Sequence, residues 1–236
     1  MEAIWQGVKA AVHLLFSGDP ETWRITFLTL RVSGLATLIS VLLGVPAGVL
    51  LALTRFPGRR VLISLVNTGM ALPPVVVGLW VSIFLWRSGP LGFLQLMYTP
   101  AAMVIAQTVI AAPVIAGFTL AGIGQLDPQL AMQLTALGAS RWQLYRLLVR
   151  EARLSILAAV IAGFGAVVSE VGASTMVGGN IPGQTRVLTT ATVMEVSKGN
   201  YNLAIGISIV LLLLAYAVTL SLTLLQQRGR QPWVMR

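Results

Sequence analysis

The sequence predicts an all-α integral membrane protein with about five membrane-spanning helices. Of its 236 residues, 56% are hydrophobic and only 10% are charged, and the mean hydropathy is +0.86. A soluble domain of this length usually carries far more charge. Five stretches also contain the roughly 20 apolar residues needed to cross the hydrocarbon core of a bilayer.

An amphipathic segment precedes these stretches. Its apolar residues recur at helical spacing, namely Ile4, Val8, Val12 and Leu15, with Trp5 and Phe16 nearby. We expect residues 1–20 to form a helix that lies along the membrane surface rather than across it. The acidic Glu2 and the lack of a small-residue cleavage site argue against a signal peptide.

The predicted spans cover residues 24–54, 61–87, 100–123, 154–177 and 202–226. The first is long enough to require tilt or an extension beyond the bilayer. Pro73 and Pro74 in the second span and Pro113 in the third remove backbone donors, so these helices should kink or break. Broken helices often line cavities, although proline kinks serve packing equally often.

Lysine and arginine predict the orientation, because they concentrate in cytoplasmic loops. With the N-terminus outside, the inner side receives Arg55, Arg59, Arg60, Arg141, Arg146, Arg150, Arg153, Arg228, Arg230 and Arg236. The outer side then holds Lys9, Arg24, Arg87, Arg186 and Lys198. We therefore expect a cytoplasmic C-terminus. The net charge of +9 is explained by topology, and nucleic acid is not expected as a partner.

The whole chain, 1–236, is predicted to form a single transmembrane domain. Its parts are the interfacial helix 1–20 and a core, 24–226, that contains a cytoplasmic loop at 124–153. Asp127 and Pro128 suit the start of a short helix over about 128–137, which Gly138 would end.

A second short helix should begin near Ser140. It would carry Trp142, Tyr145 and Val149 on one side, and Arg146, Arg150 and Arg153 on another. Two interpretations are open. The arginines can meet lipid headgroups, or the helix can enter a groove on a cytoplasmic partner with its aromatic residues as anchors.

The run LTALGASRWQLYRLLVREAR (134–153) resembles the cytoplasmic loop of permease subunits of bacterial ATP-binding cassette (ABC) importers. In that family a short helix, a glycine and a second helix dock into the ATP-hydrolysing subunit. Gly138, Ala139 and Arg141-Trp142 match the pattern, whereas Met132-Gln133 replaces its usual Glu-Ala and Arg150-Glu151 its usual Leu-Pro. The resemblance implies that Gly138, Ala139, Arg141, Trp142, Tyr145 and Arg146 dock the ATPase.

Six further segments extend the resemblance over nearly the whole chain. They are TLRVSG (29–34), FPGRR (56–60), ALPPVVVGL (71–79), SGPLGFL (88–94), YTPAAMVIAQ (98–107) and SEVGASTMVGGNIPGQTRVLTTA (169–191). Together they are similar to permeases of the tungstate importer group, which neighbours the molybdate and sulfate permeases.

This resemblance implies a type I importer permease fold in the cytoplasmic (inner) membrane of a bacterium or archaeon. The implied partners are a second copy of the chain, two cytoplasmic ATP-binding subunits and an extracytoplasmic substrate-binding protein. The implied activity is import of an oxyanion by alternating access. Tungstate is the favoured substrate, and molybdate or sulfate is the alternative.

Several polar residues are candidates for the translocation pathway. Glu170 falls in the fourth span, where a carboxylate needs a partner, and Arg31 in the first span is the candidate, within one chain or across a dimer. Alternatively, Glu170 lies solvated near the outer end. Gln107 and Ser169 could line a pore or pack helices. The remaining candidates are Pro73 and Pro74 in the second span and Asn180 and Arg186 in the segment GGNIPGQTR (178–186).

That segment cannot continue a helix, because glycines and a proline interrupt it. As an outer or re-entrant loop it would offer backbone amides and polar side chains to an oxyanion. An ordinary outer loop that contacts the binding protein is the alternative interpretation.

Other classes of function fit the sequence poorly. Neither Lys9 nor Lys198 is followed by Ser or Thr, so the phosphate-binding ATPase motif is missing, and ATP with magnesium is expected only on a partner. A gradient-driven transporter commonly shows several intramembrane carboxylates or matching broken halves. With one histidine, His13, and no cysteine, we expect no catalytic residues, metal site or cofactor in this chain.

Overall fold

The computed structural model describes residues 2–16 and 18–227, and over these residues the protein is mostly helical and contains no strand. In chain order the helices are α1 (Glu2–Phe16), α2 (Pro20–Leu53), α3 (Arg59–Met70), α4 (Pro74–Leu85), α5 (Pro100–Gly124), α6 (Pro128–Ala136), α7 (Arg141–Glu151), α8 (Arg153–Val168), α9 (Gly172–Gly178), α10 (Leu188–Ser197) and α11 (Tyr201–Gln227). A short 3₁₀ turn, Gly92–Leu94, lies between α4 and α5. The all-α prediction is confirmed.

Three helices, α2, α5 and α11, are each long and apolar enough to cross a membrane. The number rises to five if each of two bent helix pairs forms one span. With 34 residues, α2 is about 51 Å long at 1.5 Å per residue, well beyond the hydrocarbon thickness. This agrees with the tilt or extension expected of the first span.

The second predicted span is broken, as its proline pair indicated. Helix α3 ends at Met70, and α4 leaves at 103° to it after the break. Pro73 is the residue before α4, in an extended conformation, and Pro74 is its first helical residue, so neither needs a helical N–H partner. In contrast, α5 runs without interruption through Pro113, and α2 through Pro46. Pro113 therefore does not break its helix.

The fourth predicted span, 154–177, is wrong as a single helix. Helix α8 ends at Val168, and α9 begins only at Gly172. Ser169 and Glu170 still donate their amides to carbonyls of α8, at 3.4 and 3.3 Å. The Glu170 side chain then accepts hydrogen bonds from amides at the start of α9, which separates the two helices.

Helix α5 lies at the centre of the bundle and packs most extensively against α2. At two glycines of α2 the backbones themselves are in contact. A Cβ atom at Gly44 would lie 2.7 Å from the carbonyl oxygen of Ala112, and one at Gly48 would lie 2.5 Å from that of Ala116. Helix α8 packs on another side of α5, so these three helices form the middle of the structure.

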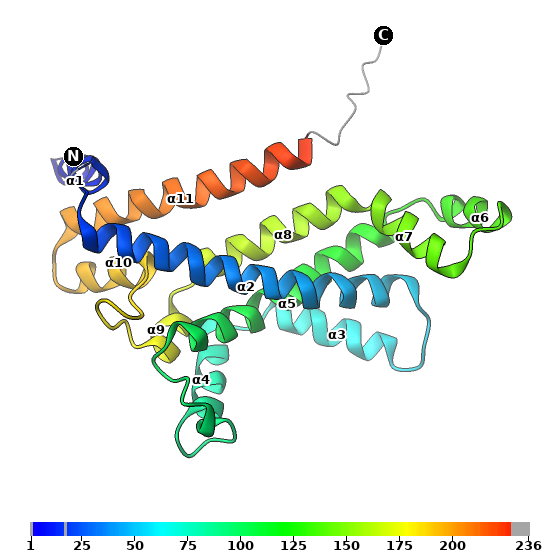
Figure 1. Ribbon diagram of the computed structural model, residues 1–236, viewed down its shortest axis with the longest axis horizontal. Coiled ribbons are helices and arrows are strands. Elements are labelled where there is room, and N and C mark those ends of the chain that lie inside the picture. The colour runs from blue at the N-terminus through cyan, green and yellow to red at the C-terminus, as the bar shows by residue number, and fades with distance from the viewer. Residues whose placement is uncertain (1, 17, 228–236) are drawn as a thin grey trace, which may run out of the picture.

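The two ends of the bundle differ in what they carry (Figure 1). At the α1 end lie α1, the start of α2, the loop after α9, and α10. At the α7 end lie the α2–α3 connection and the α6–α7 hairpin, with seven of the arginines assigned to the cytoplasmic side, from Arg55 to Arg153.

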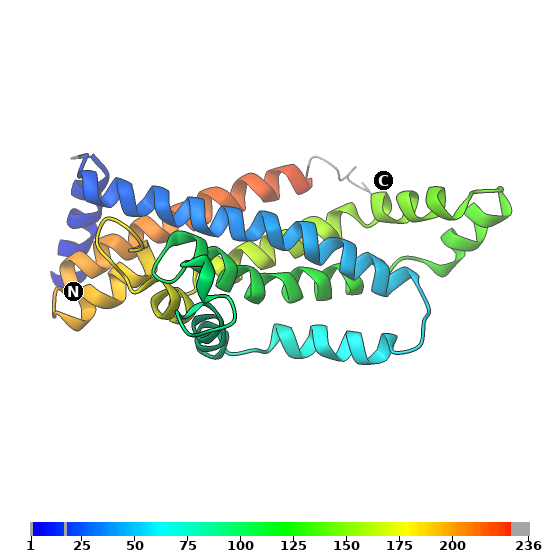
Figure 2. The same ribbon diagram turned by 60° about the horizontal axis from the view of Figure 1, so that its bottom comes forward.

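Helix α1 crosses the first turns of α11 instead of running parallel to it (Figures 1 and 2). Gln6 and Asn202 are joined by a 2.8 Å hydrogen bond, and Gly7 packs against Ile205. On the other side of α1, Trp5 and Val12 are exposed. The helix predicted for residues 1–20 is thus shorter, since α1 ends at Phe16 and α2 begins at Pro20, and its place along a membrane surface stays a prediction.

Candidate functional site

The α6–α7 hairpin is built by local hydrogen bonds at three positions. Asp127 precedes α6 and accepts a 2.9 Å hydrogen bond from the amide of Gln129. Gly138 has φ +83°, a conformation that side chains other than glycine rarely adopt, and it turns the chain between the helices. Ser140 and Gln143 then cap α7 reciprocally. The predicted helix, glycine and second helix are all confirmed.

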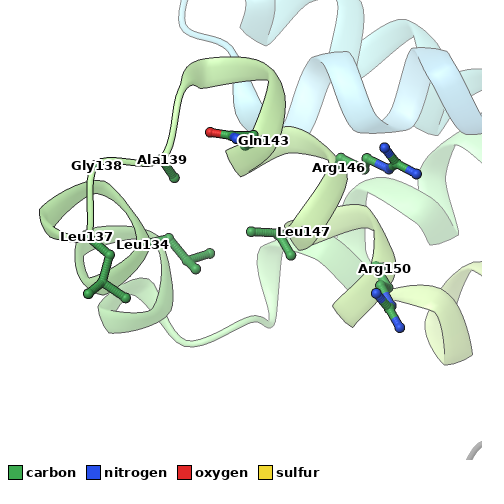
Figure 3. A pocket seen from close by; sticks show the side chains of 8 residues that line it. All are labelled: Leu134, Leu137, Gly138, Ala139, Gln143, Arg146, Leu147 and Arg150. Carbon is green, nitrogen blue, oxygen red and sulfur yellow. The ribbon is translucent and has the colours of Figure 1, made fainter.

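A hollow of about 550 Å³ lies between the two arms of the hairpin (Figure 3). Its lining comes from both helices and the turn: Leu134, Leu137, Gly138, Ala139, Gln143, Arg146, Leu147 and Arg150. Leu137, which lines the hollow, is 83% exposed, and Met132, elsewhere on α6, is 64% exposed. The hairpin therefore presents apolar surface and arginines together.

The two sides of α7 are used differently. Trp142 is 74% exposed and Tyr145 is half-buried, while Gln143, Arg146 and Arg150 line the hollow. Arg153 is not on α7 as predicted, because the chain bends by 62° between α7 and α8 and Arg153 begins α8. Leu134, Leu137 and Leu147 were not predicted to belong to this site. Leucines on short helices outside the predicted spans could have indicated an apolar contact surface.

Glu170 is buried, 5% exposed, and its carboxylate holds α9. Its Oε1 accepts a 2.7 Å hydrogen bond from the amide of Ala173, and its Oε2 accepts from the amide of Ser174 at 2.9 Å and from the Ser174 hydroxyl at 2.8 Å. The alternative of a solvated Glu170 is wrong. The carboxylate is a structural ligand of backbone amides.

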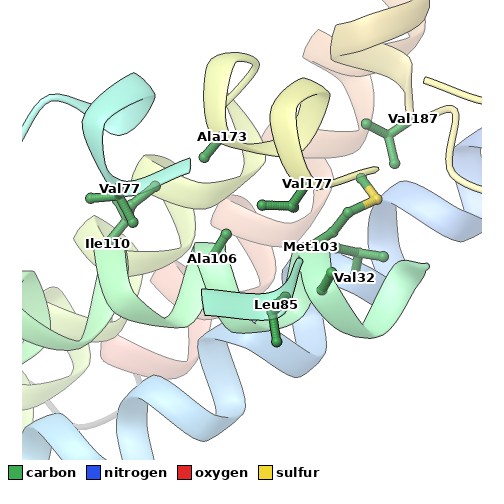
Figure 4. Close-up of a cluster of buried hydrophobic side chains, with 10 residues drawn as sticks. Val32, Val77, Leu85, Met103, Ala106, Ile110, Ala173, Val177 and Val187 are labelled. Atoms are coloured by element: carbon green, nitrogen blue, oxygen red, sulfur yellow. The ribbon is translucent and has the colours of Figure 1, made fainter. Parts of the chain in front are cut away.

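Two neighbouring helices join this carboxylate network. The Gln107 side chain on α5 donates a 3.2 Å hydrogen bond to the Ser174 hydroxyl, and Thr189 on α10 donates to the carbonyl of Glu170 at 3.0 Å. Ala173 and Val177 of α9 lie in the main buried cluster with Met103 and Ala106 of α5 (Figure 4). Polar and apolar contacts thus fix α9 on the bundle.

Within one chain, the predicted Arg31–Glu170 pair is not formed. Arg31 is exposed and forms no ion pair with Glu170 over residues 2–16 and 18–227, whereas Arg186–Glu21 and Lys198–Glu195 are ion pairs. The physical reason is that the amides of α9 already satisfy the Glu170 carboxylate. Pairing across a dimer stays a prediction.

The other predicted pathway residues do not all lie in the Glu170 network. Pro73 and Pro74 lie at the start of α4, close to the start of α9, because a Cβ atom at Gly172 would lie 2.7 Å from Cγ2 of Val75. Ser169 is exposed and donates to the carbonyl of Gly165 in its own helix. Gln107 and Glu170 are thus brought together through Ser174, and Ser169 is not part of that network.

The loop 179–187 connects α9 to α10, and hydrogen bonds within it engage several of its backbone amides. The carbonyl of Ile181 accepts from the amides of residues 184, 185 and 186 at 3.0–3.1 Å. The Thr185 hydroxyl accepts from the Ile181 amide and donates to the Gly178 carbonyl. The amides of residues 181, 184, 185 and 186 are therefore committed within the loop, and the expectation that other amides of the loop meet an oxyanion stays a prediction.

Two polar side chains of the same loop lie close to Met194. Asn180 and Arg186 both donate to the sulfur of Met194, at 3.5 and 3.3 Å, and Arg186 also contacts Glu21 at 3.2 Å. The predicted pathway residues Asn180 and Arg186 thus lie together. No group of three metal-ligating side chains occurs within the described ranges.

Comparison with known proteins gives matches over nearly the whole chain. Residues 44–231 match the family described as binding-protein-dependent transport system inner membrane components. A tungstate uptake system permease protein, TupB, of Peptoclostridium acidaminophilum is 39% identical over 96% of this chain and all of that protein. A probable anion ABC transporter permease protein of Haloferax volcanii is 40% identical over 78% of this chain and 81% of its own length.

The fold also matches that of a solved transporter chain. A chain from the inward-facing MetNI methionine ABC transporter superimposes with a TM-score of 0.73 at 22% identity. The alignment covers 90% of this chain and 99% of that chain. At this identity the likeness describes the fold, which is that of a type I importer permease.

Proposed function

The chain belongs to the family of binding-protein-dependent transport system inner membrane components, and we propose that it imports tungstate as the permease of an ABC importer. The similarity to the tungstate uptake permease extends over the full length of that relative, which supports the choice of substrate. Molybdate and sulfate are the alternative substrates within the same class.

The observation of this structure that carries the proposal is the α6–α7 hairpin. It projects at the α7 end of the bundle, and it exposes Trp142 and Leu137 beside a hollow lined by Arg146 and Arg150. Exposed aromatic and apolar anchors with arginines around them are typical of a protein docking surface. The proposed partner is a cytoplasmic ATPase, which binds ATP and magnesium.

The proposed assembly contains two copies of this chain, two ATPases and an extracytoplasmic binding protein. Closure of the ATPases would move both hairpins and switch the pore between inward-facing and outward-facing states, which differ in the contacts that the partners make. The pore would bind the anion weakly, since tight binding would prevent its release.

The proposed orientation places the α7 end, with its arginines, in the cytoplasm and the α1 end outside a bacterial or archaeal cytoplasmic membrane. The N-terminus then lies outside and the C-terminus inside. Arg24, Arg87, Arg186 and Lys198 would face the extracytoplasmic side, where the binding protein delivers its anion.

The test is ATP hydrolysis by the chain reconstituted in liposomes with its ATPase and binding protein. Tungstate, molybdate, sulfate and no anion are compared at equal ionic strength. Stimulation by the tungstate-loaded binding protein is expected. Stimulation by molybdate or sulfate alone would reassign the substrate, and a chain that forms no complex with an ATPase would favour a gradient-driven transporter.

A further inference from the structure

Arg24 lies against the loop 179–187 and has no hydrogen bond or ion pair among the described residues. It is on α2, one turn after Glu21. Its guanidinium covers Gly183: a Cβ atom there would lie 3.1 Å from Nη1 and 3.4 Å from Cζ. Arg24 is exposed, so its five N–H groups lie beside the loop and have no acceptor among residues 2–16 and 18–227.

Arg186, in the same loop, is also incompletely satisfied. Its side chain is 13% exposed, and its buried Nε lacks a hydrogen-bond partner. Its contact with a carboxylate is the 3.2 Å pair with Glu21, whose side chain is 63% exposed. An ion pair with so exposed a partner is weak and readily exchanged. The direct carboxylate contact of this mostly buried guanidinium is therefore displaceable, while Glu195 acts on it from a longer distance across the same cavity.

The other carboxylates nearby are already engaged. Asp19 accepts hydrogen bonds from Thr22, and these lower the pKa of the Asp19 carboxyl. Glu195 is held by Lys198 at 2.8 Å and by Asn200 at 2.7 Å, which lower its pKa. All three acidic residues line a cavity of about 210 Å³ with Arg186 and Lys198, and Glu21 is the one of the three whose side chain is exposed.

We propose that Arg24 and Arg186 form an oxyanion subsite in which the Glu21 carboxylate occupies the place of the anion until a tetrahedral dianion displaces it. The guanidinium groups would donate hydrogen bonds to the oxyanion, for which their planar arrangement of donors is suited. Glu21 would turn into solvent, where its repulsion of the anion is screened.

This inference rests on the proposed function, and it adds a residue pair and an exchange step to it. The subsite lies at the α1 end, which the proposed orientation places outside. Weak binding is what the step requires, because the anion must pass from the binding protein to the pore. A carboxylate that returns to Arg186 after the anion leaves would assist its release.

The experiment is equilibrium dialysis of sodium tungstate against the chain in lipid nanodiscs, without its partners, with tungsten counted by mass spectrometry. The variants are Arg24→Gln, Arg186→Lys, Glu21→Gln and, as a matched control, Arg87→Gln. Arg87 is likewise an exposed arginine assigned to the outer side, but it lies in the α4–α5 connection. Sodium sulfate should compete for the site, and sodium chloride at equal ionic strength should not.

Glu21→Gln should bind tungstate about two- to fivefold more tightly, because a competing carboxylate is removed. Arg24→Gln and Arg186→Lys should each bind at least about twofold more weakly, and Arg87→Gln should match the unaltered chain. Absence of tungstate binding to the unaltered chain would overturn the proposal. So would Glu21→Gln binding no more tightly, or Arg24→Gln behaving like Arg87→Gln.

ATP hydrolysis by the complete complex separates this inference from the proposed function. If the unaltered complex shows no anion-dependent stimulation, the proposed function fails whatever dialysis gives. If Arg24→Gln leaves dialysis unchanged but weakens stimulation by the binding protein, Arg24 is a docking residue and the subsite is refuted.

Discussion

Replacing Glu170 by alanine should loosen α9 from the bundle. The substitution removes the acceptor of two backbone amides, those of Ala173 and Ser174, and of the Ser174 hydroxyl. The amides have no other acceptor in the first turn of α9, because helices leave their first N–H groups unpaired. The Ser174 hydroxyl can rotate to a backbone carbonyl, so we do not count it.

The magnitude follows from the two amides. A buried donor left without an acceptor costs about 1–3 kcal/mol, so Glu170→Ala should destabilise the chain by about 2–6 kcal/mol. Glu170→Gln keeps one acceptor oxygen and should lose roughly half as much. Ser169→Ala is the matched control. Its hydroxyl is exposed and bonds only within α8, so the change should stay within about 0.5 kcal/mol.

The assay is the apparent melting midpoint in detergent. For a chain of this length, about 1 kcal/mol corresponds to about 2–4 °C. Glu170→Ala should therefore lower the midpoint by at least about 4 °C, and Ser169→Ala by less than about 2 °C. Equal midpoints for the two variants would refute the role of the carboxylate.

A double-mutant cycle with Arg31 extends this test. Since Glu170 and Arg31 do not pair within one chain, Arg31→Ala and Glu170→Ala should be additive within about 0.5 kcal/mol in the monomer. A larger coupling that appears only in the assembled dimer would establish the pair across two copies. Coupling in the monomer would contradict the hydrogen-bond network described above.

Three further predictions concern the hairpin and the α1 end. Trp142→Ala should leave the melting midpoint nearly unchanged and abolish the coupling of ATP hydrolysis to transport in liposomes. Trp23 is also an exposed tryptophan, near the start of α2, and Trp23→Ala should preserve this coupling. Gly138→Ala should destabilise the hairpin by about 1 kcal/mol, because the φ of Gly138 is +83°, and hydrogen exchange in the hairpin should become faster. Gly124 is a helical glycine with open space around it, so Gly124→Ala should be neutral or stabilising. Lowering of the Glu195 pKa in the folded chain gives stability above the ordinary carboxyl pKa of 4.5 that is lost as pH falls below it. Glu195→Gln should therefore lower the midpoint at about pH 7, and that difference should shrink progressively as the pH is lowered from 4.5 through the lowered pKa of Glu195; a constant difference would contradict the assignment.

The hairpin could be predicted from the sequence because its signals are local. Asp127 before Pro128, a glycine at the turn, and Ser140 three residues before Gln143 each act on neighbouring backbone groups. The break at Pro73 and Pro74 is local in the same sense. Where a conformation depends on residues within one or two turns, the sequence pattern is sufficient.

Glu170 and Pro113 show where that reasoning ends. The sequence indicated that a carboxylate in a span needs a partner, and the nearest candidate by chemistry was an arginine. The partners are backbone amides that become available only because the helix breaks next to Glu170. Likewise, α5 continues through Pro113 while packed between α2 and α8, a tertiary environment that no local pattern contains.

Helix α8 connects the α6–α7 hairpin to the break at Glu170, where α9 follows. It is a rod of 16 residues, about 24 Å long, that follows a 62° bend after α7 and ends at the break held by Glu170. A displacement of the hairpin by an ATPase would pass along this rod to α9, provided that α9 is fixed at its first turn. Glu170→Gln nearly keeps the shape of the side chain but removes its negative charge and one acceptor oxygen, which weakens that attachment. It should therefore reduce transport per ATP hydrolysed more than Ser169→Ala does. Equal ratios in both variants would show that α8 does not transmit the motion to α9.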